Sequence, residues 1–150
     1  MPAADRDRAA LLAKTPGSQL QDDRRCFACG PDNHQGLQLR FEYGEGTATA
    51  VWQPAKRFAG WTTILHGGVV ATLLDEAMAH AAIAAGVRAV TGRLEIRFRK
   101  AAPMDAALIA HGRLESRRGR MLVLSATVHG EDGTLYAQAQ GRFVADDAGA

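Results

Sequence analysis

Two glycines and an aspartate in the middle of the chain have the types and spacing needed to act on a carbonyl compound. His66, Gly67 and Gly68 precede a long apolar run, and Asp75 follows within it. The first N–H groups of a helix have no internal partner and carry about half a positive charge. The Gly67 N–H is therefore a candidate donor to an oxyanion, while Gly68 lets a substrate approach the backbone closely. Asp75 has small apolar neighbours, and a carboxylate there is costly unless it is used.

Structural explanations of the same residues stay open at this point. The glycines can serve tight helix packing alone, and Asp75 can bond a neighbouring strand. Glu76 is most simply a solvated partner of His80, one turn further along the helix. Catalysis by Asp75 is therefore one of two hypotheses.

A second group of reactive residues, Cys26 and Cys29, lies near the N-terminus. Cys-x-x-Cys spacing is typical of zinc ligands and of redox pairs. A structural zinc usually has four protein ligands, and His34 is the one further histidine or cysteine close by. We expect no metal and no cofactor here, with zinc and redox chemistry as the alternatives.

Basic side chains gather at one predicted strand, at Arg97, Arg99 and Lys100. They alternate with apolar residues, so they should point outward. A solvated sheet face explains them. The alternative is that some of them bind phosphate groups, because guanidinium matches phosphate geometry well.

The elements that must position these residues follow from hydrophobic periodicity. Period-two alternation predicts strands over residues 37–43, 47–53, 94–99, 108–115, 122–129 and 134–144. One apolar helix runs from His66 to Gly86, and residues 54–65 form a loop. Short connections favour antiparallel pairing, and a helix that is apolar nearly all round must be covered on most sides. The pattern predicts an α+β hotdog fold, a curved antiparallel sheet of five to six strands wrapped around one long central helix.

Composition excludes several classes of protein. The 150 residues, 47% hydrophobic and 23% charged, suit one globular domain over residues 26–150, with residues 1–25 as an N-terminal arm or linker. A net charge of +2 is too small for a dedicated nucleic-acid binder. Asp75, Glu76 and His80 interrupt the apolar run, so we expect no membrane span. Two cysteines and an N-terminus without a signal-peptide pattern favour the cytoplasm.

Three segments resemble the hotdog acyl-CoA thioesterases of the phenylacetate-pathway and THEM type. They are residues 66–68, residues 73–77 (Leu-Leu-Asp-Glu-Ala) and residues 91–98. The resemblance covers roughly residues 26–144. Segments similar to Cys-x-x-Cys-Gly are frequent in one branch of these thioesterases, and we interpret ours as a turn that docks the N-terminal arm against the sheet.

The resemblance also implies roles for individual residues. It makes the Gly67 N–H the oxyanion donor, His66 an orienter of that loop, and Asp75 a general base or nucleophile. Thr91 becomes a polar assistant near the attacking water. The chain departs from the family at Gly60, where several members carry an asparagine six residues before the histidine.

These observations together predict an acyl-CoA thioesterase. Trp61 and Phe58 would stack on a medium-chain or aryl acyl group, and the basic residues Arg97, Arg99 and Lys100 would hold the phosphates of coenzyme A. The alternative is a non-catalytic acyl-CoA-binding or sensing protein on the same fold, which the departure at Gly60 keeps open.

Helix geometry predicts the oligomeric state. Gly67 and Asp75 lie ~12 Å apart along one helix, which is too far for both to reach one carbonyl. Two antiparallel helices of a twofold dimer would bring each Asp75 towards the partner's glycine. We expect a homodimer with two shared sites, an arrangement that the resemblance also implies. Outward-facing sheets would allow dimers to pair into a homotetramer.

Overall fold

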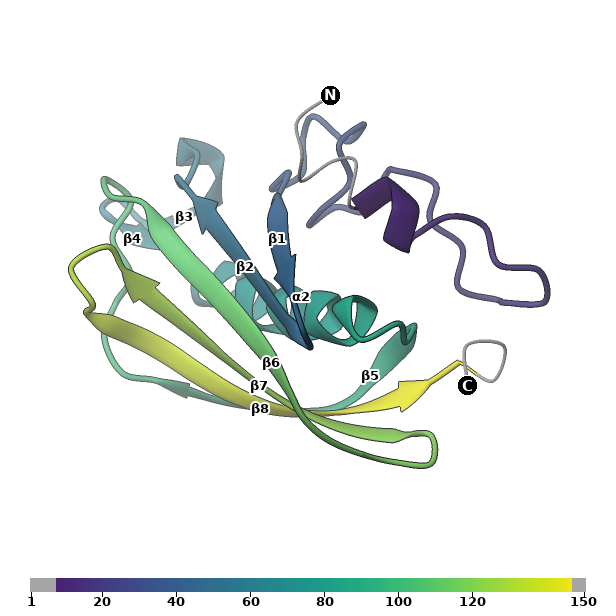
Figure 1. Cartoon of the computed structure of the whole chain (residues 1–150). Coiled ribbons are helices and arrows are strands. Elements are labelled where there is room, and N and C mark those ends of the chain that lie inside the picture. The colour runs from purple at the N-terminus through teal and green to yellow at the C-terminus, as the bar shows by residue number, and fades with distance from the viewer. Residues whose placement is uncertain (1–7, 147–150) are drawn as a thin grey trace.

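A curved antiparallel sheet wraps around one long helix (Figure 1). The computed structural model describes residues 8–146. Within this range the sheet has six strands in the order β1-β2-β6-β7-β8-β5, and the helix α2 (Gly67–Ala84) lies in its concave face. This is the predicted hotdog fold. The strands are β1 (Phe41–Gly44), β2 (Thr47–Trp52), β5 (Ala89–Phe98), β6 (Leu108–Arg118), β7 (Met121–Gly130) and β8 (Leu135–Ala145).

The helix begins and ends where its sequence signals predicted. His66 is the N-cap and accepts a hydrogen bond from the Gly68 N–H. Gly86 follows the C-cap residue Ala85 with a φ of 82°, the left-handed conformation that glycine adopts without strain. Leu73, Leu74 and other apolar side chains of α2 are buried against the sheet. None of the helices described between residues 8 and 146 has the length and apolarity needed to span a membrane.

The helix touches the sheet at one position through backbone alone. A Cβ atom added at Gly112, in β6, would lie 2.0 Å from the carbonyl oxygen of Ala77 in α2. Real Cβ atoms never come so close. Only glycine at position 112 therefore lets the backbone of β6 pack directly against the backbone of α2.

Three segments differ from the sequence prediction. The strand expected over residues 94–99 is β5, which begins at Ala89 and ends at Phe98. Residues 54–65, expected to be a loop, contain the short helix η1 (Lys56–Phe58) and a small sheet of β3 (Ala59–Trp61) and β4 (Ile64–Leu65). The first strand was expected from residue 37, but β1 begins at Phe41. Gln38 has a φ of 54°, a left-handed conformation that interrupts the extended chain shortly before β1 begins.

A bulge in β5 changes which side chains face the helix. The pairing of β5 with β8 shifts register between Thr91 and Arg93, so Gly92 is the extra residue. After the bulge, Leu94 and Ile96 pack against the core. Before it, the side chain of Thr91 reaches α2. Uninterrupted alternation would have turned Thr91 to the opposite face of the sheet.

Candidate active site

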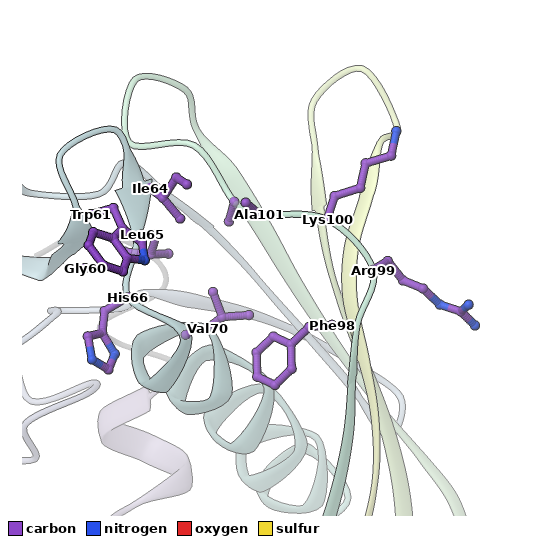
Figure 2. A pocket seen from close by; sticks show the side chains of 12 residues that line it. Gly60, Trp61, Ile64, Leu65, His66, Val70, Phe98, Arg99, Lys100 and Ala101 are labelled. Carbon is purple, nitrogen blue, oxygen red and sulfur yellow. The ribbon is translucent and has the colours of Figure 1, made fainter.

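A groove of about 490 Å³ opens at the N-terminal end of α2 (Figure 2). It lies between the small β3–β4 sheet, the first turn of the helix and the segment that follows β5. Its floor and walls are mostly apolar, and basic residues stand at its rim. The lining residues are Gly60, Trp61, Ile64, Leu65, His66, Gly67, Val70, Phe98, Arg99, Lys100, Ala101 and Ala102.

The first turn of α2 presents one backbone donor to this groove. The ring Nδ1 of His66 accepts the Gly68 N–H at 2.9 Å, and the His66 carbonyl accepts the N–H groups of Val69 and Val70. Within the described part of the chain, no residue accepts a hydrogen bond from the Gly67 N–H, and Gly67 lines the groove. This amide is the one available to an oxyanion, whereas that of Gly68 is engaged.

Asp75 lies outside the groove and is hydrogen-bonded to strand β5. The Thr91 hydroxyl donates a hydrogen bond of 2.7 Å to Asp75 Oδ1. Burial raises the pKa of Asp75, the bond from Thr91 opposes that rise, and the charge of Glu76 adds to it. The carboxyl group therefore binds a proton more readily than an ordinary aspartate does, a property that suits a general base.

A single chain does not bring the groove and Asp75 together. Neither Asp75 nor Thr91 lines the groove. The helix is continuous from Gly67 to Ala84, so the two groups stay ~12 Å apart along its axis.

The remaining predicted residues divide between the groove and other surfaces. Trp61 lines the groove with 78% of its surface exposed, and Figure 2 shows Arg99 and Lys100 extending away from its floor. The structure does not place Phe58 or Arg97 in it. Phe58 packs on Trp52 with ring centroids 5.7 Å apart. Arg97 lies beside Ser125 and Gln138 on the sheet.

Sequence reasoning missed several lining residues. Phe98, Ile64 and Val70 face the groove, and Phe98 is 55% exposed. Alternation had assigned Phe98 to the inner, buried face of β5. Its place at the end of the strand was the one signal that it could instead be exposed. Gly60 packs on His66, because a Cβ added there would lie 3.1 Å from the His66 Cα.

Comparisons with known proteins identify the family. Residues 62–137 match the family model of the Thioesterase superfamily. The chain is 30% identical over 113 residues to acyl-coenzyme A thioesterase THEM4 of Mus musculus, covering 71% of this chain and 49% of the relative. It is 29% identical over 148 residues to acyl-coenzyme A thioesterase THEM5 of Homo sapiens, covering 94% and 60%. The chain therefore spans about half the length of the curated relatives it matches.

A solved structure agrees with this assignment. The crystal structure of a thioesterase superfamily protein superimposes with a TM-score of 0.76 at 26% identity, over 81% of this chain and 60% of that one. The family match extends over half of the sequence and includes the first turn of α2, Asp75 and Thr91. The chain belongs to the thioesterase superfamily.

Proposed function

We propose that the protein hydrolyses acyl-CoA thioesters to a carboxylic acid and coenzyme A. The observation that carries this proposal is the unengaged Gly67 N–H at a helix N-terminus, in a groove whose walls are apolar and whose rim is basic. A thioester carbonyl needs such a donor when its oxygen becomes negative. The names of the THEM4 and THEM5 relatives, both acyl-coenzyme A thioesterases, support the substrate class.

The proposed reaction needs two groups of the chain. The Gly67 N–H stabilises the oxyanion that forms when the carbonyl is attacked. As a general base, Asp75 takes a proton from water, the resulting oxygen attacks the carbonyl carbon, and the C–S bond breaks to release the thiolate, which then gains a proton. As a nucleophile, an Asp75 oxygen would attack the carbon itself, release the same thiolate and form an anhydride that water then cleaves.

The distance between these groups favours a homodimer with shared sites. The helix is unbroken over 18 residues, so Asp75 cannot fold back to the amide of its own chain. A twofold partner with an antiparallel helix would bring its Asp75 to the groove. Helix α2 has room for such a neighbour, because Ala71, Thr72 and Asp75 are only partly buried in the single chain.

The groove also supports a substrate preference. Trp61 and Phe98 offer exposed aromatic surface, and Ile64 and Val70 extend the apolar lining. These side chains suit a medium-chain or aryl acyl group better than acetyl. Arg99 and Lys100 at the rim would hold the phosphates of coenzyme A.

The test is release of free thiol from a panel of acetyl-, octanoyl- and phenylacetyl-CoA. We expect the highest kcat/KM with one of the two larger substrates and loss of hydrolysis in Asp75→Asn. Asp105→Asn, an exposed carboxylate away from both groups, is the matched control.

A non-catalytic acyl-CoA binder is the second candidate. Gly60, which has no side chain and packs on His66, occupies the position where several family members have an asparagine. Tight binding of every substrate without release of thiol would favour it over hydrolysis.

A further inference from the structure

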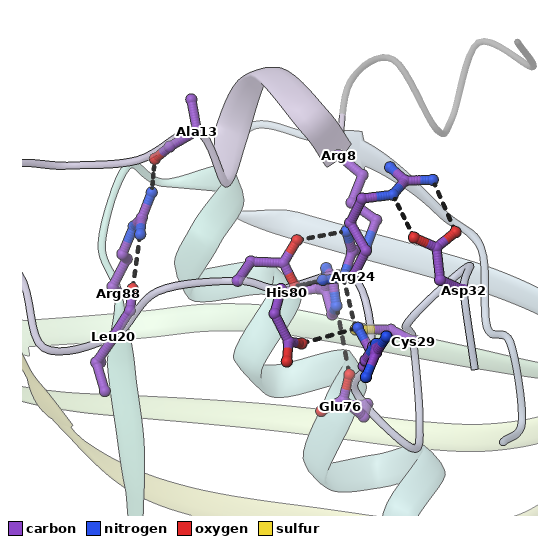
Figure 3. A network of polar contacts seen from close by, with 12 residues as sticks. Arg8, Ala13, Leu20, Arg24, Cys29, Asp32, Glu76, His80 and Arg88 are labelled. Atoms are coloured by element: carbon purple, nitrogen blue, oxygen red, sulfur yellow. Dashed lines mark hydrogen bonds and ion pairs between the residues drawn. The ribbon is translucent and has the colours of Figure 1, made fainter.

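Two cysteines and a glutamate meet next to residues 8–22 of the N-terminal arm. Figure 3 shows two of the three, Cys29 and Glu76. The Sγ atoms of Cys26 and Cys29 and a carboxylate oxygen of Glu76 all lie within 4.8 Å of one another. Both thiols are free, and Cys29 is buried. The sequence prediction of no metal rested on His34 as the nearest further ligand. His34 is exposed and lies near Gln38 instead. The third ligand, the carboxylate of Glu76, comes from helix α2, which lies far from the two cysteines in the sequence.

The turn that carries the cysteines is shaped as a ligand loop. The Ala28 N–H donates to Cys26 Sγ at 3.4 Å, and the Gly30 N–H donates to the Cys26 carbonyl at 2.8 Å. A Cβ at Gly30 would lie 2.4 Å from the Cys26 nitrogen, so the turn closes only with glycine. The N–H groups of Leu37 and Leu39 bond the carbonyls of residues 27 and 28 and anchor the turn to the domain. A backbone donor aimed at sulfur favours the thiolate, the form that binds metals.

The carboxylate of Glu76 is incompletely hydrogen-bonded. Its side chain is 16% exposed, and its Oε2 atom has no solvent contact and no hydrogen bond among the described residues. His80 Nε2 lies 3.4 Å from that oxygen, within ion-pair distance but without a hydrogen bond. A buried carboxylate oxygen without a hydrogen bond destabilises the folded chain. A cation bound between Glu76 and the sulfurs would take the place of the missing hydrogen bond.

We propose that Cys26, Cys29 and Glu76 form a zinc site that fastens the N-terminal segment, defined as residues 8–30, to α2. Zinc binds thiolate and carboxylate ligands together, at about 2.3 Å and 2.0–2.2 Å. Ligand atoms within 4.8 Å of one another need to move by only about an ångström to reach those distances. Binding releases the two thiol protons and leaves the ion with two thiolates and one carboxylate.

The surroundings balance the charge of this site. Two thiolates, one carboxylate and Zn²⁺ carry a net charge of −1. The Arg8 guanidinium, 5% exposed, lies 3.6 Å from Cys29 Sγ and offsets that charge (Figure 3). Arg8 is itself held by two bonds of 2.8 and 2.9 Å to Asp22. The N-terminal segment therefore contributes both the sulfur ligands and the compensating cation.

His80 lies beside Glu76 but is not among the three residues whose ligand atoms all lie within 4.8 Å of one another. Its Nε2 atom is 3.4 Å from Glu76 Oε2, so the imidazole is a neighbour of the proposed carboxylate ligand. Tyr43 Oη lies 2.8 Å from the other ring nitrogen, Nδ1. Phe41 stacks on the imidazole at 4.2 Å and fixes the ring plane.

Metal titration of the whole chain tests the proposal. The protein is purified with a reductant, stripped with a chelator and titrated with Zn²⁺ against a chromophoric competitor. We expect one ion per chain and, with zinc at 100 times its Kd, a rise in Tm of ~5–10 °C. Titration with Co²⁺ should give the sulfur-to-cobalt charge-transfer absorption in the near ultraviolet, which a merely structural role of the cysteines would not produce.

Three variants separate the ligands from their neighbourhood. Cys26→Ser should weaken zinc binding by at least ~100-fold and lower the charge-transfer absorption by about half. Glu76→Gln should weaken binding at least ~10-fold with the absorption retained, because both sulfurs remain. His34→Ala, the matched control, should bind as the unchanged protein does.

Either of two results would overturn the proposal. One is a reduced, folded protein that binds neither ion with a stoichiometry near one. The other is formation of a Cys26–Cys29 disulfide in the presence of excess zinc, which would identify a redox pair. Because the readouts are metal content and absorption, they do not depend on whether the protein hydrolyses acyl-CoA.

Discussion

Thr91 Oγ1 donates a hydrogen bond of 2.7 Å to Asp75 Oδ1 and so connects the edge strand β5 to the middle of α2. Burial raises the pKa of Asp75, and this bond acts in the opposite direction by favouring the charged carboxylate. The proton affinity of the proposed base therefore depends on a strand that has only one neighbour within its own sheet.

Removing the bond should change the pH profile of hydrolysis. In Thr91→Val the carboxylate loses a donor, so the pKa of Asp75 rises further. The acidic limb of kcat/KM, where activity requires the charged form, should then move to higher pH. The pH dependence of thiol release measures this shift. Thr72→Val is the control, because the Thr72 hydroxyl bonds the Gly68 carbonyl and not Asp75. If the acidic limb of Thr91→Val does not move, the group whose ionisation controls hydrolysis is not the Asp75 carboxylate bonded to Thr91.

Asp75 should also lower stability at neutral pH. Its pKa in the folded chain lies above its usual value, so the folded state resists ionisation. The cost is absent below the unfolded pKa, near pH 4, and grows as pH rises through the folded pKa. Asp75→Asn should therefore have the higher Tm at pH 7, and this difference should vanish at pH 3. Thermal unfolding at both pH values provides the comparison. A lower Tm of the variant at pH 7 would contradict it.

The helix and most strands follow from the sequence because their signals are local. Alternation and the glycine at position 86 depend on residues close in the chain, and the observed helix end agrees with them. Local signals do not predict which face of the sheet the Thr91 side chain lies on, because the bulge at Gly92 arises from pairing with β8. Glycine in a strand is a signal of such a bulge, but it does not say which face results.

The surroundings of Glu76 show a second limit of sequence reasoning. Its i+4 spacing to His80 correctly predicted that the two side chains meet, at 3.4 Å. The assumption that the pair is solvated was wrong, since His80 is 1% exposed. The residues that cover it come from the N-terminal segment and β1, and no periodicity within α2 reports them.

The contact between β6 and α2 predicts a large loss of stability in Gly112→Ala. The added methyl group would meet the backbone of Ala77, which cannot rotate away. The free energy of unfolding should fall by ~3 kcal/mol or more. Urea denaturation measures it, with Gly67→Ala as the control, because a Cβ there meets only Phe98 at 3.9 Å. Equal stabilities of the two variants would show that the sheet can shift away from the helix.

Trp61 should contribute affinity for the acyl group rather than stability. It is 78% exposed, so Trp61→Ala removes little buried surface from the folded chain. Loss of its stacking surface should raise KM for phenylacetyl-CoA about tenfold, with a smaller effect on acetyl-CoA. Met121→Ala, which removes an exposed apolar side chain outside the groove, should leave both values unchanged. An equal rise in KM for both substrates would place Trp61 against the coenzyme instead.

Shared sites predict that two inactive variants restore each other's activity. Gly67→Pro removes the proposed oxyanion donor, and the backbone accepts proline there because it is the first residue of α2 and His66 before it has a ψ of 132°. Asp75→Asn removes the proposed base. Co-refolding equal amounts makes half of the dimers mixed, and each mixed dimer has one intact site out of two. About a quarter of the unchanged protein's activity should return.

Mass spectrometry of the mixture distinguishes the possible results. Recovery of hydrolysis together with mixed dimers requires that Gly67 and Asp75 act across an interface, since neither chain carries both groups. Mixed dimers without recovery would mean that a single chain holds the complete site, and the ~12 Å between the two groups along α2 would then require the helix to change shape on binding substrate. Refolding each variant alone controls for residual activity, and the unbroken helix leads us to expect none from either.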